Sequence, residues 1–158
     1  MTQIAHDSVG WIHVLASVIA MISGAVVITS AKGTRRHKLL GYVFVGSMLC
    51  VLVTAMLIYR LFGRVGPFHV FALIGFVYLA IGIIPALRRS PNWLNLHIRF
   101  MYWSVVGLYA AFVAEIGVRI PNTPFWGAVI VAVLIVTVTG AVFYGKYRAS
   151  WRKVLDQT

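Results

Sequence analysis

The sequence has 158 residues, of which 61% are hydrophobic and only 11% are charged. A soluble domain carries roughly 25% charged residues, so the composition excludes an ordinary soluble protein and indicates a single integral membrane domain. The formal net charge of +11 does not indicate nucleic-acid binding, because the basic residues gather at the ends of long apolar runs.

Five such runs follow one another, and each is long enough for a helix to cross an apolar layer about 30 Å thick. They predict an all-α membrane bundle with transmembrane spans at approximately residues 9–31, 37–60, 67–87, 92–118 and 123–145. Short connections favour antiparallel neighbours. The first four spans are expected to form the core. The fifth has no titratable residue before Lys146 and is expected to be an accessory helix.

Several residues mark where the spans begin and how they pack. The expected caps and first residues are Asp7 or Ser8 for the first span, Thr34 after a turn at Gly33 for the second, Pro67 for the third, and Ser90 with Pro91 for the fourth. Small residues recur at a spacing of four in the first span, at Ala16, Ala20 and Gly24. This stripe predicts close helix packing, with room for a flat ligand as the alternative.

The distribution of basic residues predicts the topology. With five spans, eleven of them fall on one side and three on the other. The larger group comprises Lys32, Arg35, Arg36, Lys38, Arg88, Arg89, Arg99, Lys146, Arg148, Arg152 and Lys153, and the smaller comprises Arg60, Arg64 and Arg119. The positive-inside rule therefore predicts an N-terminus outside and a C-terminus in the cytoplasm, with anionic lipid on the cytoplasmic face.

Four histidines lie near the ends of the first four spans, at His13, His37, His69 and His97. Because successive spans alternate in direction, His13 and His69 are expected at the outer boundary, and His37 and His97 at the inner one. From His13 to Lys32 is 19 residues, or about 28 Å of helix. The two histidine layers should thus lie about 20 Å apart, which is too far for one metal site but suits two stacked cofactors.

Paired imidazoles at each face fit the two axial ligands of a b-type haem, whose potential the apolar wall would tune. The two carboxylates of an inner haem would emerge near a group of cations, namely Arg35, Arg36, Lys38 and Arg99. The prediction is a transmembrane electron carrier with one or two haem b groups that exchanges electrons with quinol. Glu115 is expected to accept a proton near the outer pair, with an ion pair to Arg119 as the alternative.

Two other functions remain open. The outer histidines, with His6 and Glu115, form a plausible ligand set for zinc or copper in a metal-binding or transporting protein. Alternatively, the four histidines are interfacial polar residues of a non-catalytic bundle that assembles with a partner, with anionic lipid or with further copies of itself. Motifs for nucleophilic hydrolysis, phosphate binding and HExxH zinc chemistry are absent from the sequence.

Three motifs, KGTRRHKLLGYVF (32–44), GPFHVFAL (66–73) and NLHIRFMYW (95–103), resemble those of a bacterial family of small membrane proteins classed as a domain of unknown function. The resemblance covers roughly residues 10–119, and its most specific element comprises Gly33, Thr34, His37 and Gly41. It implies a multi-pass protein of the bacterial inner membrane without an established activity. The family typically follows its last histidine with two basic residues, whereas this chain has Ile98 and then Arg99.

The layout of the histidines alone is similar to that of cytochrome b561-type dihaem proteins, in which histidines of the first and third spans, and of the second and fourth, pair on opposite faces. That similarity implies ligand roles for His13 with His69 and for His37 with His97.

Overall fold

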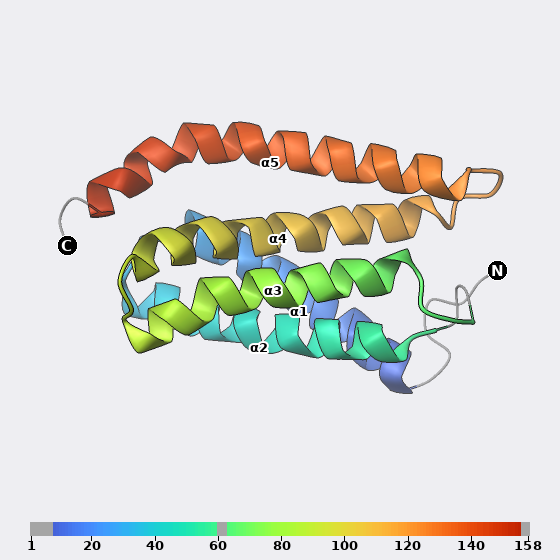
Figure 1. The fold of residues 1–158 in the computed structure, drawn as a ribbon, viewed down its shortest axis with the longest axis horizontal. Coiled ribbons are helices and arrows are strands. Elements are labelled where there is room, and N and C mark those ends of the chain that lie inside the picture. The colour runs from blue at the N-terminus through green and yellow to red at the C-terminus, as the bar shows by residue number, and fades with distance from the viewer. Residues whose placement is uncertain (1–7, 60–62, 156–158) are drawn as a thin grey trace. The chain divides into compact units, whose positions relative to one another are not determined.

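The computed structural model describes residues 8–59 and 63–155, and every regular element in them is a helix. The five helices are α1 (Ser8–Thr29), α2 (Arg35–Leu57), α3 (Pro67–Arg88), α4 (Trp93–Gly117) and α5 (Phe125–Leu155) (Figure 1). Each contains a window long and apolar enough to cross a membrane. The predicted class, an all-α protein with five membrane-spanning helices, is confirmed.

The start of α2 follows the prediction from local chemistry. Gly33 adopts the left-handed conformation at φ 76°, which costs little for a residue without Cβ. Thr34 then takes the extended cap conformation, and its hydroxyl accepts the backbone N–H of His37 at 3.2 Å. Pro67 is the first residue of α3, also as predicted. In α1, Ser8 is already helical, and Asp7 lies outside the described residues.

The predicted start of α4 is wrong by two residues. Pro91 lies in a turn rather than in the helix, and Asn92 at φ 60° is the cap in place of Ser90. The Ser90 carbonyl accepts the N–H of Trp93 at 3.1 Å and closes this turn. Asn tolerates the left-handed conformation better than most residues, so the helix begins after Asn92. His97 therefore lies in the second turn of α4.

By the compactness of its parts, the chain divides into two units, residues 1–77 and 78–158, with the boundary inside α3. The first unit contains the antiparallel helices α1 and α2 (Figure 1). The small-residue stripe of α1 is buried, with Ala20 completely inaccessible, as close packing requires. Phe44 of α2 is likewise fully buried. The prediction of one transmembrane domain stays a prediction.

The second unit contains α4 and α5, which run antiparallel to each other (Figure 1). The Tyr102 hydroxyl of α4 donates to the Gly140 carbonyl of α5 at 2.7 Å. Near the end of α5, Trp151 is buried, and its ring lies 5.6 Å from that of Tyr102. Aromatic packing explains why α5 continues past the predicted end of its span, because these last turns have a partner on α4.

Candidate functional site

In the first unit, Thr54 determines which ring nitrogen of His13 donates a hydrogen bond. His13 Nδ1 lies 2.9 Å from Thr54 Oγ1. The Thr54 hydroxyl directs its own proton to carbonyls of its helix, Cys50 O at 2.6 Å and Val51 O at 3.0 Å. Thr54 Oγ1 is therefore the acceptor and His13 Nδ1–H the donor. In the neutral ring, the lone pair then resides on Nε2.

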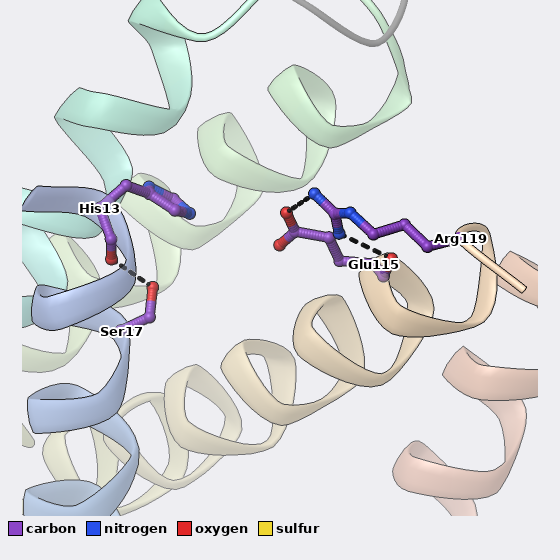
Figure 2. Close-up of polar contacts among 4 residues, drawn as sticks. All are labelled: His13, Ser17, Glu115 and Arg119. Carbon is purple, nitrogen blue, oxygen red and sulfur yellow. Dashed lines mark hydrogen bonds and ion pairs between the residues drawn. The ribbon is translucent and has the colours of Figure 1, made fainter. Parts of the chain in front are cut away.

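The backbone around His13 is also tied in place. The Ser17 hydroxyl donates to the His13 carbonyl at 2.8 Å, one turn along α1 (Figure 2). Thr54 is buried, so the hydrogen bond from His13 links α1 to α2 away from bulk water. The imidazole is thereby held at the end of α1 where the sequence places it, in the second turn.

His69 has the opposite arrangement of its ring nitrogens. Its Nδ1 accepts the backbone N–H of Gly66 at 3.1 Å, while its own backbone N–H donates to the Gly66 carbonyl at 3.0 Å. The first bond is one half of a capping box, with histidine in the place usually taken by Glu or Gln. Gly66 has no side chain to form the other half, and its backbone carbonyl accepts the N–H of His69 instead. The His69 ring packs on Tyr59 at a centroid distance of 4.9 Å. Since Nδ1 is an acceptor, the proton of the neutral ring is on Nε2.

A haem ligand coordinates through an unprotonated nitrogen, so the bond from Gly66 does not fit ligation by His69 Nε2. Ligation there would require the ring to give up this bond and move its proton to Nδ1. The predicted pairing of His13 with His69 around one iron stays a prediction, and only His13 has the tautomer that it requires.

His37 lies in the first turn of α2, half-buried and surrounded by cations. Its backbone N–H is the one capped by Thr34. The neighbouring Arg35, Arg36 and Lys38 are exposed, as expected for residues at a membrane boundary. They remain accessible to anionic groups, which is what the predicted carboxylate contacts need.

Lys32, which precedes these cations in the sequence, caps the C-terminal end of α1. Its Nζ donates to the carbonyls of Val27 at 3.0 Å and Ile28 at 2.6 Å. These carbonyls belong to the last turn of the helix, where a cation is favourable. Burial nevertheless disfavours the charged amine and lowers the pKa of Lys32 to about 8.

In the second unit, His97 has the same tautomer as His13. Its Nδ1 lies 3.0 Å from the carbonyl oxygen of Gly82, and since a carbonyl can only accept, Nδ1 carries the proton. The bond depends on a close approach of α3 and α4. A Cβ added at Gly82 would lie 2.8 Å from Met101 Sδ and 3.1 Å from its backbone nitrogen. The absence of a side chain at Gly82 therefore brings its carbonyl within reach of His97.

Two residues beside His97 were not among the predicted site residues. The Trp93 ring lies 6.4 Å from the imidazole, and the Arg89 guanidinium carbon lies 4.8 Å from the Trp93 ring centroid. Arg89 is thus linked to His97 through one aromatic ring, while Arg99 is exposed. Trp93 could have been predicted as a neighbour of His97 from the sequence, because a spacing of four residues puts both side chains on one helix face.

Glu115 forms an ion pair near the end of α4. Arg119 Nη2 lies 2.7 Å from Glu115 Oε1, and Nη1 donates to the Glu115 carbonyl at 2.8 Å (Figure 2). The side chains are 33% and 38% exposed. This is the ion pair that the sequence allowed as the alternative. A role of Glu115 as proton acceptor stays a prediction.

A model of the family described as "Predicted membrane protein (DUF2306)" matches residues 10–148. The chain belongs to this family. The match reaches well into α5, so the likeness extends beyond residues 10–119, the region in which the sequence motifs indicated the resemblance. No curated protein and no solved structure matches the chain at a significant level.

The structure describes only part of the metal site that the sequence predicts. Within residues 8–59 and 63–155, no three His, Cys, Asp or Glu side chains group closely enough to hold a metal ion. His6, the third expected ligand of a metal site, lies outside the described residues. A structural zinc site needs four protein ligands and a catalytic one three, whereas a haem iron needs at most two from the protein.

Proposed function

We propose that this membrane protein is an electron carrier that binds b-type haem through His13 and His97. The supporting observation is that these two histidines have the same tautomer. Each donates Nδ1–H to a protein oxygen, to Thr54 Oγ1 at 2.9 Å and to the Gly82 carbonyl at 3.0 Å. Histidines that ligate metals almost always donate the other ring N–H in this way, which fixes the tautomer and makes the ligand nitrogen more basic.

When bound, haem supplies an iron centre that takes up and releases single electrons at a potential set by its ligands and surroundings. The chain orients the imidazoles and keeps water away from them with apolar helices. Exposed cations near the inner histidines remain for the haem carboxylates: Arg35, Arg36, Lys38, Arg89 and Arg99.

Three further parts of this proposal rest on the sequence. His37 and His97 belong to different units of the chain, and their pairing is proposed from the alternating direction of the spans in the sequence alone. Quinol is the proposed exchange partner. The proposed location is the bacterial cytoplasmic membrane, with the N-terminus outside.

The test is the absorption spectrum of protein purified from haem-replete cells. A Soret band that shifts on reduction with dithionite, and a pyridine haemochrome of one to two haems per chain, are expected. His97→Ala and His13→Ala should each remove haem. Substitution of Thr29 by alanine should not, because its hydroxyl donates only to carbonyls of its own helix, those of Ala25 and Val26. A colourless protein from such cells would overturn the proposal.

A further inference from the structure

His69 is a buried imidazole with an unused hydrogen-bond donor. Its side chain is 4% exposed, and Gly66 N–H occupies Nδ1 at 3.1 Å, so the proton is on Nε2. That atom has no hydrogen-bond partner in the described part of the chain. A buried donor without an acceptor is destabilising, because it has lost its hydrogen bonds to water and gained none in return. Native proteins keep few such groups, and those they keep require an explanation.

The position of His69 limits what could satisfy this donor. It is the third residue of α3, a helix of 22 residues, and the N-terminal end of a helix favours partial negative charge. The Tyr59 ring packs against that of His69, at a centroid distance of 4.9 Å. A phosphate or carboxylate would have to lose its hydration to reach a nitrogen buried this deeply, which is costly. A carbonyl oxygen on a lipid-soluble ring reaches it at a smaller cost and accepts the same hydrogen bond.

Tyr59 packs on the His69 ring and is the side chain that such a ligand would have to displace. The tyrosine is 44% exposed, so its side chain can move without disturbing a packed core. Tyr59 also lies five residues after Thr54, the partner of His13. A chain of five residues spans at most about 17 Å, so His13 and His69 are anchored at the same end of α2.

We propose that His69 Nε2–H binds the carbonyl oxygen of a lipid-soluble quinone. This inference rests on the electron-carrier function and assigns its proposed quinone partner to one side chain. It assigns His69 to the quinone rather than to the iron, and it leaves His13 as the nearby haem ligand.

The bond from Gly66 N–H to the side chain at position 69 suggests a matched pair of variants, His69→Gln and His69→Glu. Both side chains accept the Gly66 N–H, as Gln and Glu do at this position in other helices. Only Gln retains an N–H donor. We expect His69→Gln to bind a decyl-substituted 1,4-benzoquinone within about threefold of the unmodified protein, and His69→Glu to bind at least about tenfold more weakly.

Binding is measured by equilibrium dialysis against the full-length protein in lipid nanodiscs. With ¹⁵N-histidine labelling, the Nε2–H resonance of His69 should also shift as this quinone is added. Absence of quinone binding to the unmodified protein, or equal binding by His69→Glu, would overturn the inference.

Haem content separates this inference from the proposed function. Both variants should keep the haem content of the unmodified protein. Loss of one haem from both would make His69 an iron ligand and overturn the inference. Quinone binding with the Gln–Glu contrast in a protein that contains no haem would uphold the quinone site and overturn only the electron-carrier function.

Discussion

At the scale of single residues, the hydrogen-bond partner of Nδ1 determines the tautomer of each histidine. An oxygen that can only accept, or whose proton is engaged elsewhere, forces Nδ1–H at His13 and His97. A backbone N–H forces the reverse at His69. Three imidazoles that look equivalent in the sequence therefore differ in which ring nitrogen carries the proton of the neutral ring.

Replacement of Thr54 tests this orientation at His13. Thr54→Val preserves the shape of the side chain but removes the acceptor, whereas Thr54→Ser retains a hydroxyl. If His13 ligates haem, Thr54→Val should weaken its binding by about 10- to 100-fold, the usual effect of losing such an orienting group. Haem titration of the haem-depleted protein measures this affinity, and ¹⁵N NMR of His13 reports the tautomer. Equal affinities for the two variants would contradict the orienting role.

Lys32 is predicted to react as an unusually neutral amine. Its pKa is lowered by burial from 10.5 to about 8, so about half of it is neutral at pH 8, against about 0.3% of an ordinary lysine. Its acylation rate should level off above pH 8, which peptide mapping by mass spectrometry can follow. A rate that keeps rising tenfold per pH unit up to pH 10 would refute the lowered pKa.

The same shift fixes the sign of the pH dependence of stability. Between pH 8 and 10.5 the unfolded chain holds more protons at Lys32 than the folded one. The contribution of this residue to the free energy of unfolding therefore rises with pH across that window and is lowest below it. Lys32→Arg, which keeps its charge throughout, should lack this rise.

At the scale of elements, the approach of α3 to α4 depends on one missing side chain. A Cβ at Gly82 would lie within 3.1 Å of the Met101 backbone nitrogen, so Gly82→Ala should push the helices apart at an overpacking cost of about 1–3 kcal/mol. A fall of the thermal unfolding midpoint, together with loss of the His97 Nδ1–H signal, is expected.

Gly107 of α4 provides the matched control. A Cβ there meets nothing within 4 Å, so Gly107→Ala should gain the usual preference for alanine in a helix, up to about 1 kcal/mol. If both variants shifted the midpoint in the same direction, close packing at Gly82 would not be the cause.

The elements themselves were largely predictable, because their signals are local. Apolar runs bounded by charge locate the helices, and Thr34 and Pro67 mark two of their starts. The start of α4 was missed because a proline fits both a first helical turn and a preceding turn. The roles of His69 and His97 could not be predicted, because each depends on a contact of the folded chain, with Gly66 and with Gly82.

At the scale of the whole molecule, the family match includes most of α5, which the sequence suggested was merely accessory. In the structure, buried side chains hold this helix to α4 within the second unit. Tyr102 donates to the Gly140 carbonyl at 2.7 Å, and its ring lies 5.1 Å from that of Tyr144. Trp151 completes this cluster from beyond the apolar part of the helix.

Trp151 should therefore contribute far more to stability than its position near the chain end suggests. It is 8% exposed, whereas Trp126, at the other end of α5, is 61% exposed. Trp151→Ala should lower the free energy of unfolding by about 3 kcal/mol or more, as for other buried tryptophans, while Trp126→Ala should have a much smaller effect. Thermal unfolding in nanodiscs compares them directly. Equal midpoints for the two variants would mean that the last turns of α5 do not hold the helix to α4.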